Sequence, residues 1–460
     1  MNKKNYVAVA TLAFAMLTSC AGQKEAKSTS GIDLANMDTT VSAGTDFFRY
    51  ACGGWNDAHP LTAEYSRYGT FDELFENSQK QLRELIEGLA AQKNNQAGSA
   101  AQKIGDLYNM AMDSVTLNKQ GAEPVKAMLD KIAGMKDKSE IVPMMTEMAH
   151  IGIGTYFHSY VYADPKNSSL NIFQMGQGGI NLGEKEYYLD TDSITQNIRE
   201  QYKLYIGKLF QLAGFSEADA QQKVADVMEI ETAIAKVSRS ATELRDPEAN
   251  YHKMSFDELK KTIAGIDWDA YMKGLGIQAP AELNVEQVEP IQEVARLMNT
   301  LPLSKHVSYL EYNLLDAAAS CLSDDFVAAR FDFYGKVLSG RQVNQPRWKR
   351  AVNSVNGMLG ELVGEMYVEK YFPAAAKERM VKLVKNLQTA LGERIDAQEW
   401  MSDSTKIRAH EKLAAFHVKV GYPDKWKDYS KLEIKNDSYW ANVCRASEWG
   451  FNDMYSRIGK

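Results

Sequence analysis

The feature that most restricts the fold of this 460-residue chain is a helical spacing of apolar residues, which recurs along most of its length. The first segment of this kind contains Phe71, Leu74, Phe75, Leu82, Leu85, Ile86 and Leu89. Seven more segments follow the same steps of three and four, at 104–112, 198–212, 224–237, 306–322, 326–338, 352–371 and 380–395. Amphipathic helices bury their apolar faces mainly by packing on one another, so we predict a mainly α fold.

One segment breaks the helical period. Residues 156–163 (YFHSYVYA) and 170–175 (LNIFQM) are rich in aromatic and β-branched residues, and residues 164–167 (DPKN) between them have the composition of a turn. This arrangement predicts a β-hairpin, and residues 283–288 are a weaker candidate for a strand. The predicted fold is therefore a large multi-helical lobe with a small β-hairpin insertion.

The beginning of the chain has the features of a bacterial lipoprotein signal. A positively charged start precedes an apolar run at 7–16 that is too short to span a bilayer, and LTSC, ending at Cys20, matches a lipobox. We predict removal of residues 1–19, lipidation of Cys20, and a flexible tether over residues 20–43, which are mostly small and polar. The alternative is an ordinary cleaved signal with an incidental thiol at Cys20. The predicted location is the cell envelope, at the outer membrane, on either its periplasmic or its outer face.

Charge and cysteine content narrow the possible partners. The chain has 53 basic and 60 acidic residues, and cleavage of the signal would remove Lys3 and Lys4. A moderately acidic surface without a basic block argues against nucleic acid as the main partner. Cys52, Cys321 and Cys444 would remain, and an odd number in an exported protein leaves at least one thiol unpaired or bonded outside this chain.

Basic residues gather around Trp348, at Arg347, Lys349 and Arg350. Such a group could suggest a nucleic-acid patch. Three charges at the start of a long helix in an acidic, exported protein are more often a solvated helix face. We therefore expect these three side chains to face solvent.

Residues 44–72 are the most distinctive stretch of the sequence, and further short motifs follow them in a fixed order. They are N-L-G at 181–183, Y-Y-L at 187–189, R-D-P at 245–247, Y-H-K-M at 251–254, Y-L at 309–310, R-W at 347–348, M-Y-V at 366–368, Y-F at 371–372, W-M-S-D at 400–403 and K-V-G-Y-P-D at 419–424. Each motif alone is weak, but their joint order is specific. On these residues the chain resembles the neprilysin-like zinc endopeptidases, over nearly its whole length after the tether.

This resemblance implies a helical lobe that covers a thermolysin-like catalytic lobe and encloses peptide substrates between the two. By the same correspondence, residues 44–70 form an opening segment that packs on the catalytic lobe, 71–435 the helical substrate-enclosing lobe, and 436–460 the start of the return to the catalytic lobe. The family's N-A-x-Y strand and its zinc helix have no counterpart before Lys460. We expect a truncated chain that is inactive alone, with zinc only in the full-length enzyme. In the family, the cysteine at the position of Cys52 is tied to the C-terminal half.

Arg67, in the sequence S-R-Y-G, matches the arginine with which this family binds the free C-terminal carboxylate of a peptide. A guanidinium suits this task because its rigid fork of donors fits a carboxylate. The competing interpretation is a surface arginine paired with Asp72 or Glu73. Asp72 is a second substrate-binding candidate, which would either orient Arg67 or place negative charge in the first turn of the following helix.

His410 and Glu411 begin like the H-E-x-x-H zinc motif, whose second histidine lies four residues after the first and so shares its helix face. Position 414 is Ala, and His417 is seven residues away, so the spacing does not suit one zinc ion. We therefore expect no metal ligand and no catalytic residue in this chain.

A second class of function remains open, a non-catalytic helical lipoprotein that binds peptides or glycans. The glycan-binding version predicts helical repeats of about 34 residues, and the sequence contains no such repeat. The peptide-binding version differs from a truncated peptidase only in what the gene encodes after codon 460.

Overall fold

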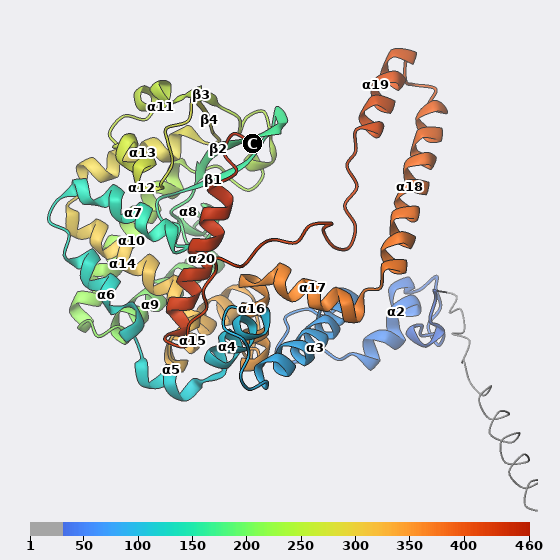
Figure 1. The fold of residues 1–460 in the computed structure, drawn as a ribbon, viewed down its shortest axis with the longest axis horizontal. Helices are drawn as coiled ribbons and strands as arrows, with labels where there is room; N and C mark the ends of the chain where they lie inside the picture. Colours follow the sequence, from blue (N-terminus) through green and yellow to red (C-terminus); the bar gives the residue numbers. More distant parts are fainter. Residues whose placement is uncertain (1–30) are drawn as a thin grey trace, which may run out of the picture. The chain divides into compact units, whose positions relative to one another are not determined.

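The structure is a computed structural model that describes residues 31–460 (Figure 1). The predicted signal peptide, Cys20 and part of the predicted tether lie outside the described residues. Contacts divide the chain into two compact units, one that ends at Thr62 and one that runs from Ala63 to Lys460. Throughout the described range, no helix combines the length and the apolarity needed to cross a membrane.

In the first unit, a short 3-10 helix and the helix that follows it approach closely. They are η1 (Leu34–Asn36) and α2 (Phe47–Ala58). A Cβ atom at Gly54 would lie 2.1 Å from the carbonyl oxygen of Ala35, so any side chain there would clash with the backbone. The absence of a side chain at Gly54 therefore permits this contact.

The second unit is mainly helical, which confirms the predicted fold class. Its α-helices are α3 (Thr70–Ala90), α4 (Ala100–Met112), α5 (Ser114–Gln120), α6 (Glu123–Ala133), α7 (Ile141–His150), α8 (Glu186–Leu189), α9 (Ser193–Leu212), α10 (Glu217–Val237), α11 (Phe256–Thr262), α12 (Trp268–Gly274), α13 (Val288–Thr300), α14 (Leu303–Ala318), α15 (Asp324–Arg330), α16 (Arg347–Met358), α17 (Gly360–Tyr371), α18 (Ala374–Asp396), α19 (Asp403–Ala414) and α20 (Tyr439–Tyr455). Its other helical segments are η2 (Lys138–Glu140), η3 (Glu243–Arg245), η4 (Ala319–Cys321) and the π-helix η5 (Phe331–Leu338). Several helices begin at side-chain caps, as at Ser255 and Ser402, which accept hydrogen bonds from backbone N–H groups of the first turn.

A small sheet interrupts the helices, with the strand order β1-β2-β4-β3. The strands are β1 (Phe157–Asp164), β2 (Asn167–Gln177), β3 (Lys253–Ser255) and β4 (Glu282–Val285). β1 and β2 form the predicted antiparallel hairpin, with Phe157 opposite Gln177, whereas β4 pairs with β2 in parallel. β4 overlaps the weaker candidate strand at residues 283–285. β3 was missed because three residues are too few to show an alternating pattern.

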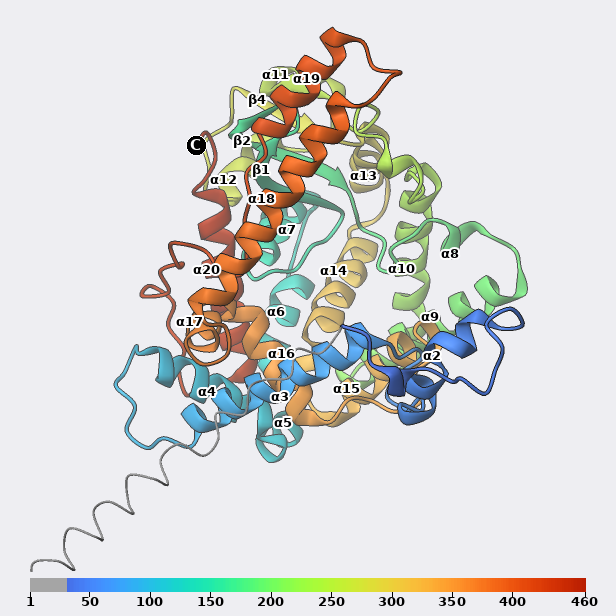
Figure 2. The same cartoon turned by 90° about the vertical axis from the view of Figure 1, so that its right-hand side faces the viewer.

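One apolar core joins these helices to the sheet. α10 contacts α9, α13 and α14, and α10 and α14 lie side by side in Figure 2. Val227, Ile230 and Ile234 of α10 are fully buried at helical spacing. Burying a side chain of this size stabilises the fold by about 1.5–3 kcal/mol, so α10 is a central element of the unit.

Glu231 of α10 is a fully buried carboxylate within this core. Asn181 Nδ2 and Tyr188 OH each donate to it at 2.7 Å, and Tyr202 OH donates at 2.9 Å. The Tyr188 hydroxyl also accepts a hydrogen bond from the backbone N–H of Leu182 at 3.0 Å. Burial raises the pKa of Glu231 to about 7, although the hydrogen bonds act in the opposite direction. The N-L-G and Y-Y-L motifs thus meet at one buried side chain.

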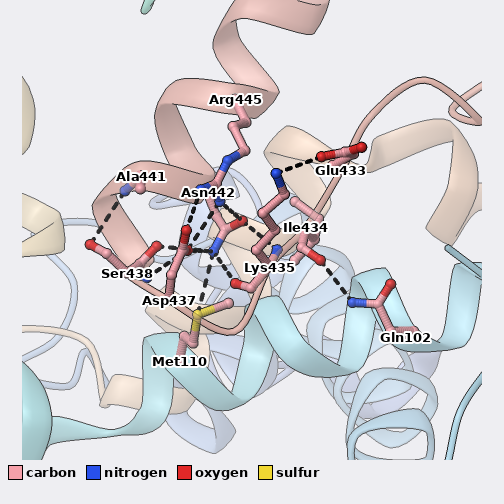
Figure 3. Close-up of polar contacts among 10 residues, drawn as sticks. All are labelled: Gln102, Met110, Glu433, Ile434, Lys435, Asp437, Ser438, Ala441, Asn442 and Arg445. Carbon is pink, nitrogen blue, oxygen red and sulfur yellow. Dashed lines mark hydrogen bonds and ion pairs between the residues drawn. The ribbon is translucent and has the colours of Figure 1, made fainter. Parts of the chain in front are cut away.

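The start of α20 is fixed by Asn442 (Figure 3). Its Oδ1 accepts from the N–H of Lys435 at 2.9 Å, and its Nδ2 donates to the carbonyl oxygens of Lys435 at 2.7 Å and Ser438 at 2.9 Å. Nδ2 also lies 3.4 Å from Met110 Sδ on α4. Asn442 is fully buried, so these contacts satisfy a polar group that would otherwise destabilise the core.

The segment before α20 is attached to α4 and to α20 itself. Gln102 Nε2 of α4 donates to the carbonyl oxygen of Ile434 at 2.9 Å, and Arg445 pairs with Asp437 (Figure 3). α20 has its own buried apolar face, and it contacts α4, α6, α7, α16 and β1. The compact unit therefore continues to Lys460. The predicted boundary between the helical lobe and the return segment at residue 435 stays a prediction.

We predict that Glu231→Gln removes a pH dependence of stability. The native carboxyl keeps its proton up to about pH 7, whereas in the unfolded chain it loses the proton near 4.5. The native protein binds more protons in this window, so its stability falls as the pH rises from about 5 to 8. At about 1.4 kcal/mol per pKa unit, the loss is on the order of 3 kcal/mol. Urea unfolding of the wild type and of Glu231→Gln, each at pH 5 and pH 8, measures this loss of stability.

His306 changes the free energy of unfolding with pH in the opposite direction to Glu231, and its presence in both proteins provides a control. Burial lowers the pKa of His306 to about 4, so its contribution is present above pH 6.5 and is lost as the pH falls toward 4. Both proteins contain His306, so the difference between them isolates Glu231. The same change in unfolding free energy with pH in the two proteins would show that Glu231 is not the source.

Candidate functional site

Arg67, the first predicted substrate-binding residue, lies in the loop of residues 63–69 that leads into α3, and its side chain is exposed. No hydrogen bond or ion pair connects Arg67 to any other residue between 31 and 460. A surface pair of Arg67 with Asp72 or Glu73 is therefore not formed. The guanidinium is available to an anion from solution.

A buried cation braces this loop from a distant part of the sequence. Lys349 Nζ of α16 lies 2.9 Å from Glu64 Oε1 and 3.0 Å from Glu76 Oε1. The hydroxyls of Tyr65 and Tyr68 donate to the Glu76 carboxylate at 2.8 and 3.1 Å. We call these five residues the Lys349 cluster. Because the cluster holds residues on both sides of Arg67, the loop presents that arginine from a fixed base.

The electrostatics of the Lys349 cluster favour the charged forms of Lys349 and Glu76. Lys349 is only 6 % exposed. Burial acts against its charge, but Glu64 and Glu76 outweigh burial and raise the pKa of Lys349. Burial also acts to raise the pKa of Glu76, and here the hydrogen bonds from Lys349, Tyr65 and Tyr68 prevail and hold the pKa below its usual value. Both groups are therefore charged at neutral pH, and their attraction fixes the loop on α16.

The basic residues at the start of α16 are more buried than the sequence led us to expect. We expected Arg347, Lys349 and Arg350 to face solvent, but Lys349 is buried and both arginines are half-buried. The carboxylates that neutralise Lys349 are 285 and 273 residues away along the chain. No local pattern could have revealed them.

The backbone of the loop is also tied to the segment before α16. The carbonyl oxygen of Ala63 accepts hydrogen bonds from the N–H groups of Gln342 and Val343, both at 3.0 Å. Gly340, with φ +70°, makes the turn that brings this segment beside Ser66. Main-chain bonds and the Lys349 cluster thus hold the loop at separate points.

Asp72, the second predicted residue, caps α3. Its carboxylate accepts a hydrogen bond from the N–H of Gly69 at 2.9 Å. Negative charge in the first turn also stabilises the N-terminus of a helix. Capping is thus the role that the geometry supports for Asp72, and direct contact with a substrate stays a prediction.

An exposed apolar surface follows Arg67 in the chain. Phe71, Leu74 and Phe75, on the first turns of α3, are 89, 57 and 51 % exposed. The helical spacing predicted that these residues are buried, which is wrong for this part of the helix, whereas Ile86 on the same face is fully buried. Periodicity identifies the apolar face of a helix but not how much of it is covered.

The described residues do not fit a zinc ion. Between residues 31 and 460 there is no group of three or more His, Cys, Asp or Glu side chains placed to hold a metal. His410 Nε2 pairs with Asp396 at 2.7 Å, and Glu411 pairs with Arg408 at 2.7 Å. Both side chains are thus engaged in ion pairs, and the expectation that this chain holds no metal ligand stays a prediction.

The thiols of Cys321 and Cys444 are not activated nucleophiles. Cys52, Cys321 and Cys444 are free. Burial raises the pKa of Cys321 to about 11 and that of Cys444 to about 12, so both stay protonated at neutral pH. The expected link from Cys52 to a C-terminal half stays a prediction.

We predict that Lys349→Met destabilises the protein by about 3 kcal/mol, because it leaves Glu64 and Glu76 partly buried without their cation. The matched control is Lys370→Met. Lys370 pairs with Glu84 at 2.6 Å where both side chains are exposed, and such pairs contribute less than about 1 kcal/mol. Urea unfolding measures both losses, and equally small losses would contradict a bracing role for Lys349.

Comparison with protein families and relatives places the chain among known peptidases. The model of Peptidase family M13 matches residues 43–423. Endothelin-converting enzyme 1 of Rattus norvegicus is 29 % identical over 426 residues, which cover 89 % of this chain and 54 % of that protein. Membrane metallo-endopeptidase-like 1 of Homo sapiens is 26 % identical over 447 residues, with coverages of 89 and 56 %. The chain thus spans about half the length of these relatives.

Solved structures support the same assignment. The zinc metalloprotease ZMP1 of Mycobacterium tuberculosis, in complex with an inhibitor, matches with a TM-score of 0.87 and 32 % identity over 93 % of this chain and 64 % of that one. PEPO from Lactobacillus rhamnosis matches with a TM-score of 0.78 over 89 % of this chain and 66 % of that one, and at 19 % identity it shares the fold. The chain belongs to Peptidase family M13, the neprilysin-like metallopeptidases, and corresponds to the N-terminal domain of that family.

Proposed function

We propose that this chain is the substrate-enclosing N-terminal part of a lipid-anchored bacterial zinc endopeptidase, and that Arg67 binds the C-terminal carboxylate of the peptide substrate. One observation carries the proposal. The Arg67 guanidinium is exposed, has no partner between residues 31 and 460, and stands on a loop fixed by the Lys349 cluster. Membership of Peptidase family M13 supports a peptide as the substrate class.

The chemistry of Arg67 fits a carboxylate. A guanidinium can form two parallel N–H···O bonds to one carboxylate, which an ammonium group cannot reproduce. Because the loop is already ordered, binding costs less conformational entropy than it would on a mobile segment. The exposed Phe71, Leu74 and Phe75 would offer apolar contact to the last side chains of the peptide.

Peptide hydrolysis requires residues outside this chain. The sequence contains no H-E-x-x-H motif, and the described residues do not fit zinc. We assign the metal and the catalytic base to a thermolysin-like lobe that is not part of these 460 residues. In that lobe, zinc would polarise the peptide carbonyl and activate water.

An exposed stripe on α18 supports such a partner lobe. Met380, Leu383, Leu387 and Leu391 recur at helical spacing and are between 41 and 61 % exposed. Apolar helix faces without cover often mark contact surfaces. We propose that the catalytic lobe covers this face in the complete enzyme.

The anchor is proposed from the sequence alone. Acyl chains on Cys20 would hold the protein at the outer membrane, since each buried methylene contributes about 0.8 kcal/mol. The peptidase would then act within the cell envelope, on peptides rather than on nucleic acid.

We expect Arg67→Met to abolish a preference for peptides with a free C-terminus. The wild-type chain should bind a fluorescent peptide acid at least about tenfold more tightly than the corresponding amide, because a hydrogen bond to a charged group contributes about 1.5–3 kcal/mol. The variant should bind the two peptides equally. Fluorescence polarisation gives the four dissociation constants.

Arg379→Met is the matched control, because Arg379 is also an exposed arginine, on α18. This variant should keep the preference for the acid. If the wild-type chain binds acid and amide with equal affinity, Arg67 does not have the proposed role.

We also expect the 460-residue chain alone to show no EDTA-sensitive cleavage of a quenched fluorescent peptide, because the zinc ligands would be missing. An intact zinc endopeptidase of Peptidase family M13 serves as the positive control. Turnover by the purified chain that EDTA abolishes and zinc restores would overturn the assignment of catalysis to another lobe.

A non-catalytic peptide-binding lipoprotein would use the same Arg67 site. The nucleotide sequence after codon 460 separates the two functions. An open frame that encodes N-A-x-Y and H-E-x-x-H indicates the peptidase, and a stop followed by an intergenic region indicates the binding protein.

A further inference from the structure

Arg350, on α16, has an environment unlike those of the other basic residues described above. Its Nε atom is buried and has no hydrogen-bond partner between residues 31 and 460. No ion pair within the same range involves its guanidinium. Burial lowers the pKa of Arg350, and the positive charge of Arg347 acts in the same direction. Buried donors without partners are rare in native proteins, so this one requires a physical explanation.

Arg350 lines a cavity of about 400 Å³ where α16 meets α4, α5, η4 and α20. The polar lining includes both arginines and the hydroxyl groups of Ser320, Ser354 and Tyr439, and it includes no Asp or Glu. The cavity therefore has two positive charges and no negative charge in its wall. Its size is within the range of small-molecule sites.

The two arginines are not equivalent. Arg347 pairs with Asp324 and donates to the carbonyl oxygen of Ala111 at 3.2 Å. Asp324 also accepts a hydrogen bond from Asn118 at 2.9 Å, so its carboxylate is shared between these partners. Of the two arginines in the cavity wall, Arg350 is thus the one with a donor left available to a ligand.

We propose that this cavity binds a small oxyanion, a carboxylate or a phosphate, through the Arg350 guanidinium. Either group offers two oxygens that match the fork of guanidinium donors. Ala111, Leu117 and Ala351 leave apolar space beside the arginine for a short organic body. Because the wall combines α16 with α20, a bound anion would also stabilise the contact between these helices. The site shares no residue with the loop of residues 63–69, so it is separate from the proposed peptide site.

Isothermal titration calorimetry on the 460-residue chain tests the proposal, with inorganic phosphate or sodium butyrate added at constant ionic strength. We expect saturable binding at one site per chain, and the tighter of the two ligands identifies the class of anion. Arg350→Met should weaken binding at least about tenfold, because it removes the charge-assisted hydrogen bonds. Arg408→Met should leave binding unchanged, since the Arg408 side chain is 81 % exposed on α19.

Thermal unfolding checks the folding of the variants. Arg350→Met removes a half-buried cation that has no partner among residues 31–460. Without added anion, the melting temperature of this variant should therefore equal or exceed that of the wild type. Arg350→Lys keeps the charge without the fork, and should bind more weakly than the wild type. Absence of saturable binding of both anions, or undiminished binding by Arg350→Met, would overturn the proposal. Weak binding at several sites that does not depend on Arg350 would also overturn the proposal.

Discussion

The ion pairs of Lys349 with Glu64 and Glu76 are the interaction on which the proposed site depends. They join the loop before α3 to a helix more than 270 residues later in the chain. Fixing the backbone of one residue costs about 1–2 kcal/mol, so a loop of this kind stays ordered only if strong contacts hold it. The Lys349 cluster supplies those contacts before any ligand arrives. Arg67 can therefore meet a carboxylate without first ordering its own loop.

Contacts between residues that are distant in the sequence also explain why short motifs identify the family. Asn181 and Tyr188 come from two motifs that carry little information alone, yet both donate to the buried carboxylate of Glu231. A buried carboxyl group is tolerated only when its hydrogen bonds are satisfied, so each donor is needed at its own place in the chain. The N-L-G and Y-Y-L motifs thus reflect contacts with one buried residue of α10.

The sequence predicted those parts of the structure that depend on local patterns. The helices follow from apolar spacing, and the β1–β2 hairpin follows from two β-rich runs around a turn. β3 was missed because three residues carry no readable pattern. The exposure of Phe71 was missed because the spacing does not say what covers a helix face.

The site was predictable only in part, for the same reason. Arg67 was predicted from its motif, and the structure adds its exposure and its lack of a partner within residues 31–460, while its contact with substrate stays a prediction. The Lys349 cluster could not be predicted, because its carboxylates lie far away in the sequence. The cap formed by Asp72 is a local feature, and its position in the first turn of α3 had already suggested that alternative.

Arg67, Lys349 and Arg350 have the same charge and different surroundings, and the surroundings determine what each can do. Lys349 is buried between two carboxylates and serves the fold. Arg67 is exposed to water, where the attraction between unit charges is weak and falls with added salt. The carboxylate selectivity proposed for Arg67 would therefore depend on the geometry of paired hydrogen bonds. Arg350 is half-buried, where charges interact more strongly and salt screens them less. An anion bound there should therefore persist at ionic strengths that release a carboxylate from Arg67.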